Sequence, residues 1–71
     1  MRSLRVTEKI MLGYSIERVE NYDEIGLLQE TRYEILSSET GEVVGNKDTL
    51  RGAQNLVIER ELDIALKQQA A

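Results

Sequence analysis

Residues 33–50 read YEILSSETGEVVGNKDTL and hold the strongest local signals of the chain. Tyr33 and Ile35 alternate with polar residues, as in a strand with one buried face. The polar run that follows ends at Gly41, which readily adopts the positive φ of a tight turn, and residues 42–44 are apolar enough to return as a short strand. This stretch predicts a β-hairpin.

A helix is predicted directly after this hairpin, over about residues 48–69. Asp48 or Thr49 is a suitable N-cap, because its side-chain oxygen can accept a hydrogen bond from a free amide of the first helical turn. The apolar residues of the helix fall on two stripes at the helical period. The first stripe contains Leu50, Ala53, Val57 and Ile64, and the second contains Ile58, Leu62, Ala65 and Leu66.

Upstream, the even positions from Leu4 to Ile16 are mostly apolar and the odd positions are mostly polar. This period of two predicts a strand over residues 6–19, with Gly13 as a bulge. The alternative is a short helix that starts at Thr7, because apolar residues also recur there at a spacing of four. We leave residues 1–5 outside the predicted core, as a segment that can be disordered.

Turn-compatible residues at 20–23 separate this strand from a second alternation over residues 25–36. The predicted fold is a single α+β domain, a three-stranded antiparallel β-meander followed by one long helix that packs on one sheet face (βββα). The residues expected on the covered face are Ile10, Leu12, Tyr14, Ile25, Leu27, Tyr33 and Ile35.

The predicted helix is long for a domain of this size. About 20 residues of helix span ~30 Å, whereas a chain of 71 residues has an expected radius of gyration of ~11 Å. The helix is therefore expected to extend beyond the sheet. We predict that Ile58, Leu62 and Leu66 form an oligomer interface in a homodimer. The alternative is that this second stripe wraps over a strongly twisted sheet.

Composition excludes several classes of chemistry. The chain has 71 residues, with 9 Lys plus Arg against 13 Asp plus Glu, and it contains neither Cys nor His. Catalytic dyads and triads built on these residues are excluded, and so are the usual zinc ligands. The net charge of -4 disfavours direct binding to nucleic acid. We expect a cytoplasmic protein that is not an enzyme, with no cofactor, no metal and no membrane segment.

Acidic residues concentrate around the turn at residues 20–23 and along the following strand. One interpretation is an acidic surface that docks on a basic protein partner, with Tyr22 as an aromatic anchor. The other is a solvated face whose acids pair with nearby arginines. The predicted partner-binding residues are Glu17, Glu20, Tyr22, Asp23, Glu24, Glu30 and Glu34.

These observations favour a small, non-enzymatic protein-binding domain. Small acidic domains without catalytic residues suit an inhibitor or regulator of a larger, nucleic-acid-handling protein, of the kind that phages and mobile elements carry. The alternative is a structural subunit that homo-oligomerises through its C-terminal helix. An enzyme or a small-ligand carrier ranks last, because one helix on a small sheet leaves little room for a pocket.

Overall fold

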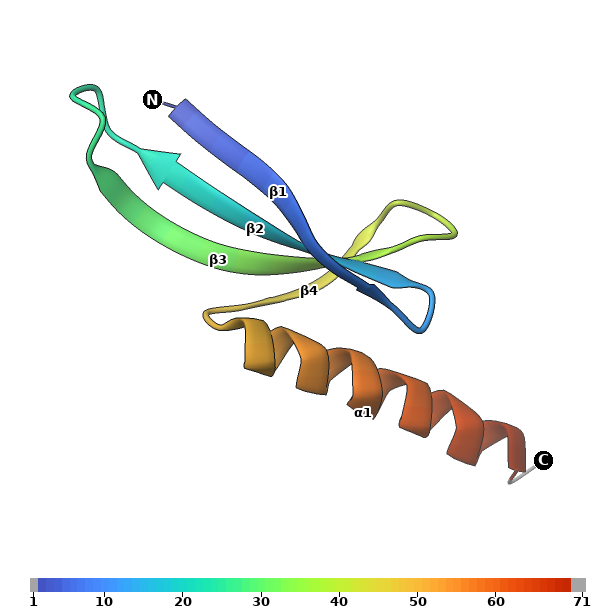
Figure 1. Cartoon of the computed structure of the whole chain (residues 1–71). Coiled ribbons are helices and arrows are strands. Elements are labelled where there is room, and N and C mark those ends of the chain that lie inside the picture. Colours follow the sequence, from blue (N-terminus) through green and yellow to red (C-terminus); the bar gives the residue numbers. More distant parts are fainter. Residues whose placement is uncertain (1, 70–71) are drawn as a thin grey trace.

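The computed structural model describes residues 2–69 and has the element order of a β-meander followed by a helix (Figure 1). The four strands form one antiparallel sheet in the order β1-β2-β3-β4, which confirms the α+β class and corrects the expected number of strands from three to four. The elements are β1 (Arg2–Met11), β2 (Tyr14–Tyr22), β3 (Leu28–Ser37), β4 (Val43–Lys47) and α1 (Leu50–Gln69).

The extra strand arises because the chain reverses at Leu12 and Gly13. Met11 pairs with Tyr14 across this two-residue turn. Leu12 has a φ of 51° and Gly13 a φ of 82°, which are the values of a type I′ turn. The prediction of one strand over residues 6–19 with a bulge at Gly13 is therefore wrong, and so is the alternative helix.

Strand β1 also begins earlier than expected. Arg2 pairs with Tyr22 and Arg5 pairs with Val19, so residues 2–5 belong to the sheet. The expectation that this segment lies outside the fold is corrected for these residues, and Met1 lies outside the described range. The register of β1 against β2 shifts between Thr7 and Lys9, which leaves Glu8 in a bulge.

Strand β2 continues through Tyr22, so the second turn falls at residues 23–27 rather than 20–23. The β3–β4 hairpin confirms the prediction made from its sequence. Gly41 has a φ of 74°. The amide of Gly41 donates to the carbonyl of Ser37 at 2.7 Å, and the amide of Ser37 donates to that of Glu42 at 2.9 Å.

The helix begins where its capping residue predicts. The amide of Gly52 donates to Oγ1 of Thr49 at 3.0 Å, so Thr49 rather than Asp48 is the N-cap. Ala53 and Val57 are fully buried against the sheet, and Leu50 packs beside them as expected. Ile64 lies on the same stripe but is 39% exposed, because α1 has by then passed the edge of the sheet.

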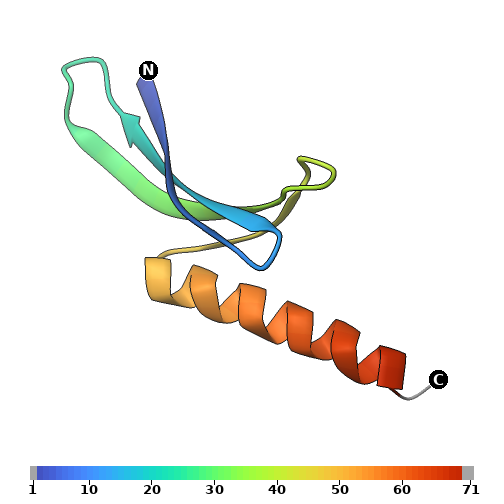
Figure 2. The same ribbon diagram turned by 45° about the vertical axis from the view of Figure 1, so that its right-hand side comes forward.

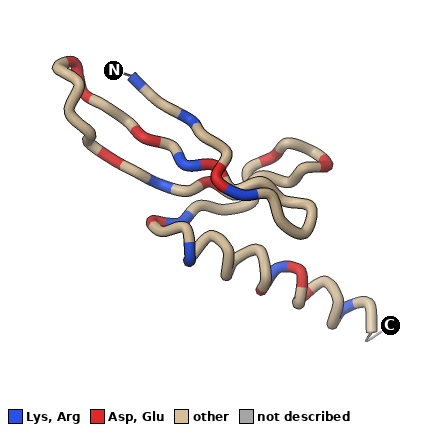
Figure 3. Tube along the Cα trace, viewed as in Figure 1, with Lys and Arg blue, Asp and Glu red and all other residues tan. Residues whose placement is uncertain are grey.

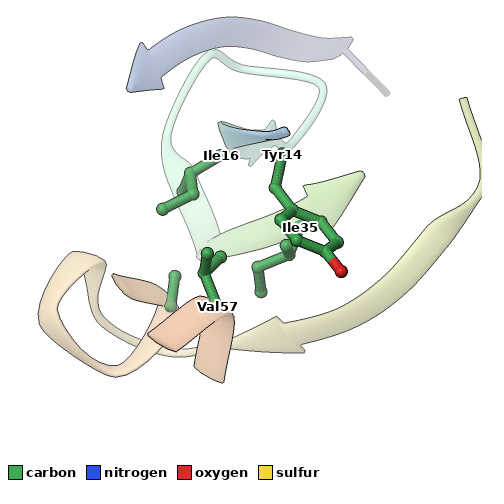
Figure 4. Close-up of a cluster of buried hydrophobic side chains, with 5 residues drawn as sticks. Tyr14, Ile16, Ile35 and Val57 are labelled. Carbon is green, nitrogen blue, oxygen red and sulfur yellow. The ribbon is translucent and has the colours of Figure 1, made fainter. Parts of the chain in front are cut away.

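The core is small and lies where α1 crosses the sheet (Figure 4). Its buried members come from β2, β3 and α1: Tyr14, Ile16, Ile35, Ala53 and Val57. Partly buried side chains pack around them: Met11, Tyr33, Val44, Leu50 and Leu56. The Tyr14 hydroxyl accepts a hydrogen bond from Nε of Arg60 at 3.2 Å, which ties the helix to the sheet at the edge of this core.

Four residues expected in the core lie outside it. The exposed fractions are 71% for Ile10, 60% for Leu12, 80% for Ile25 and 58% for Leu27. Leu12 lies in the β1–β2 turn. Ile10 points away from the core, because its neighbour Met11 is the residue of β1 that packs on the core face. Ile25 and Leu27 belong to the 23–27 loop, far from α1 (Figure 1).

The molecule is elongated, with extents of 55 × 20 × 15 Å and a radius of gyration of 14.4 Å. A compact chain of this length would have a radius of gyration of ~11 Å. Two parts project in opposite directions from the core (Figure 2). One is the C-terminal half of α1. The other, which we call the β-arm, consists of residues 2–7, 17–22 and 28–34 together with the 23–27 loop.

Candidate interaction surface

The acids predicted to bind a partner are largely paired with arginines inside the β-arm. On the sheet face opposite α1, Nη1 of Arg5 lies 2.9 Å from Oε1 of Glu17 and 2.8 Å from Oε1 of Glu34. Nη2 of Arg32 lies 3.1 Å from Oε2 of Glu34. Nη1 of Arg32 lies 3.4 Å from Oε1 of Glu30. Side chains from three strands thus neutralise much of the charge on this face.

Glu34 is the most buried carboxylate of this group, with a side chain that is 12% exposed. Burial opposes ionisation, but the guanidinium groups of Arg5 and Arg32 outweigh this effect and hold the pKa of Glu34 below its usual range. The carboxylate is therefore charged at neutral pH and already paired with two arginines of its own chain. It is poorly available to a basic partner.

A second network lies on the sheet face that α1 partly covers. Arg18 pairs with Glu8, and its Nε lies 3.6 Å from Oε1 of Glu20. The bulge at Glu8 brings that carboxylate to Arg18 on the neighbouring strand. Figure 3 shows the resulting alternation of acidic and basic residues along β1, β2 and β3. The β-arm therefore presents a mixed surface rather than an acidic one.

The remaining predicted residues lie at the end of the β-arm. Asp23 organises the 23–27 loop: its Oδ1 accepts hydrogen bonds from the amides of Ile25 and Leu27 at 3.0 and 2.9 Å. Its Oδ2 accepts one from Nε2 of Gln29 at 3.0 Å. Glu24 is exposed in this loop. Asp23 is a structural carboxylate, and Glu24 is the predicted acid that the loop leaves most open to solvent.

Apolar side chains gather around this loop, and the sequence patterns assigned two of them to the core. Leu4, Ile25, Leu27 and Leu28, which we call the arm tip, are 47%, 80%, 58% and 51% exposed. Tyr22 lies among them and is half-buried. It lines an open hollow with Leu4 and Gly26, and Ile25 borders a neighbouring hollow with Asp23 and Glu24. The arm tip is thus an exposed apolar surface with a polar rim.

The predicted oligomer-interface residues lie at the opposite end of the molecule. Ile58 is 49% exposed, Leu62 58% and Leu66 56%. The alternative that this stripe wraps over the twisted sheet is wrong, because the sheet does not reach it. The sequence carried a signal for both exposed ends. The strands contain more alternating apolar residues than one small core can cover, and the helix is longer than the core.

Within residues 2–69 no group of three or more Asp or Glu side chains is placed to hold a metal ion. The helix in that range, α1, is not long and apolar enough to cross a membrane. Comparison of the chain with protein-family models, with curated proteins and with solved structures finds no match.

Proposed function

We propose that this chain is a non-enzymatic protein-binding domain that acts by occupying a site on a larger protein. The observation that carries the proposal is the arm tip: four large aliphatic side chains, each at least 47% exposed, at the end of an arm that the core does not reach. An exposed apolar patch with a polar rim is typical of a protein contact site.

The chemistry of the arm also favours a protein partner over a nucleic acid. Arg5 and Arg32 of the β-arm are engaged with Glu17, Glu30 and Glu34. Binding phosphates with these two arginines would require their ion pairs to break, and the net charge of -4 would oppose the approach. A protein surface with an apolar groove matches the tip without any such exchange.

The test is capture of a partner by the tagged chain from a lysate of its source, compared with two matched variants. Ile25→Asp with Leu27→Asp places charges in the arm tip, in a loop whose side chains do not contribute to the core. Ile10→Asp places a charge at an equally exposed site away from the tip. We expect one reproducible partner that the tip variant loses and the Ile10 variant keeps. Equal capture by all three forms would refute the role of the tip.

The same experiment tests whether the partner is basic, as expected for a nucleic-acid-handling protein that this chain inhibits or regulates. Glu24→Lys reverses the exposed acid of the loop without disturbing the ion pairs of the sheet. If the partner is basic, capture should weaken with this variant and with rising salt, because complementary charge is screened. Capture that is insensitive to both would remove the electrostatic part of the proposal.

A second candidate is a structural subunit that assembles through α1. The exposed C-terminal half of the helix favours this function. The buried residues of α1 are Ala53 and Val57, so a helix that packed only on its own sheet could end about one helical turn after Val57. A large native mass that grows with concentration, together with no captured partner, would favour this function over the first.

A further inference from the structure

The C-terminal half of α1 presents an apolar seam on a side of the helix that faces away from the core. Ile58, Leu62 and Leu66 recur every four residues and are about half exposed. On the 3.6-residue period, Leu62 lies well around the helix from Ala53 and Val57, the two residues that are buried against the sheet. The seam is therefore an independent surface rather than an extension of the core.

The spacing of the seam is that of a helix pair. Its positions are Asn55, Ile58, Leu62, Leu66 and Gln69, which are separated by 3, 4, 4 and 3 residues. Residues three and four positions apart share one face of a helix. The spacing reads the same in both chain directions, and none of the five side chains is charged. The seam thus fits a second helix.

We propose that this helix is α1 of a second copy, packed antiparallel about a two-fold axis at Leu62. In this register Leu62 faces Leu62 of the other copy, and Ile58 faces Leu66. Asn55, at one end of the seam, faces Gln69 at the other, so the two side-chain amides can hydrogen-bond to each other. The seam is complementary to its own reversed copy, which is the requirement for a two-fold interface.

The exposed area of the chain agrees with a missing contact of this size. The accessible surface is 5234 Å². A monomeric protein of 8.1 kDa is expected to expose about 4,500 Å². The excess of roughly 700 Å² is close to the ~800 Å² that each partner buries in a standard interface. The excess is shared by the two projecting parts, and pairing through the C-terminal half of α1 would remove the part that belongs to the helix.

The arrangement has a consequence for binding. In each copy the β-arm and the C-terminal half of α1 project in opposite directions (Figure 1). Antiparallel pairing through the helices therefore places the two arm tips at opposite ends of the dimer. If the tip binds a partner as proposed above, the dimer is bivalent and gains avidity for a partner that displays two sites. This last step rests on the proposed function, whereas the pairing does not.

The test uses single cysteines, because the chain has none of its own. Leu62→Cys should form a disulfide-linked dimer on mild oxidation, since the two introduced thiols meet at the axis. Ile58→Cys alone should not, because its two Cα atoms would lie about 12 Å apart along the helices, beyond the ~7 Å limit for a disulfide. A mixture of Ile58→Cys and a mass-tagged Leu66→Cys should give the crossed dimer.

Each outcome of the cross-linking supports or refutes the proposed pairing of the two helices. Linkage of Ile58→Cys to itself, without the crossed dimer, would show a parallel pair and overturn the proposed register. Absence of any linkage at the three positions would overturn the pairing itself. Circular dichroism of the reduced variants confirms that each is folded like the wild type. Partner capture is read separately, so a chain that cross-links as expected but captures nothing refutes the function and leaves the pairing intact.

Discussion

The β1–β2 turn holds backbone strain that one substitution should remove. Leu12 has a φ of 51°, in the left-handed region where most L-residues cost roughly 1–2 kcal/mol. Its side chain is 60% exposed, so replacing it loses little buried apolar area. Leu12→Asn gives the turn the Asn-Gly pair that type I′ geometry prefers. We expect the free energy of unfolding to rise by about 1 kcal/mol and the Tm by roughly 4–8 °C.

The assay is thermal and urea unfolding followed by circular dichroism at one protein concentration, because pairing of copies would make the Tm concentration-dependent. Gly13→Ala is the matched control. Gly13 has a φ of 82°, and a Cβ there would meet no described atom within 4 Å, so the variant reports backbone strain alone. It should lose about 1 kcal/mol. A Leu12→Asn chain that is no more stable than wild type would refute the assigned turn.

Three further predictions concern the core, the helix cap and the buried carboxylate. Ile35→Ala should cost about 2–5 kcal/mol in urea unfolding, because Ile35 is fully buried under α1, and a cost below about 1 kcal/mol would contradict its place in the core. Thr49→Ala should lose about 1 kcal/mol while Thr49→Ser loses little, since only the first removes the cap oxygen; equal losses would contradict the cap. The folded pKa of Glu34 lies below its unfolded value, so its stabilising contribution is complete above the unfolded pKa and is lost as the pH falls through the folded pKa. The wild type should therefore lose more stability on acidification than Glu34→Gln, and parallel pH profiles would contradict the ion pairs.

The elements with strong local signals could be predicted from the sequence. Gly41 at a tight turn and Thr49 as a helix cap act within a few residues, so their structural effect is visible in the sequence alone. The Leu12–Gly13 turn could not be predicted in the same way. Leu is unfavourable at positive φ, and apolar residues alternate on both sides of the turn, so the pattern resembles one uninterrupted strand.

The turn also explains why core residues were misassigned. Across a two-residue hairpin, Met11 and Tyr14 are paired and share a face, so the core face passes from odd positions to even ones. Ile10 is then directed away from the core. The bulge at Glu8 shifts the register a second time. Alternation identifies a strand, but each such shift reverses which residues are buried.

The candidate surfaces were only partly predictable, because they depend on register and on the reach of the helix. Arg5 lies 29 positions before Glu34 in the sequence, and only the pairing of three strands brings them together. The excess of acids therefore suggested an acidic surface that the fold largely neutralises. The exposed stripe on α1 was predictable, since helix length follows directly from the number of residues.

The C-terminal half of α1 is proposed to pair with a second copy of the chain, and the native mass tests this pairing directly. Sedimentation equilibrium of the unmodified chain should give the mass of two 8.1-kDa chains. Leu62→Glu should give the mass of one, with an unchanged circular dichroism spectrum. A wild-type chain that stays monomeric at all concentrations, or a Leu62→Glu chain that stays dimeric, would contradict the pairing through α1.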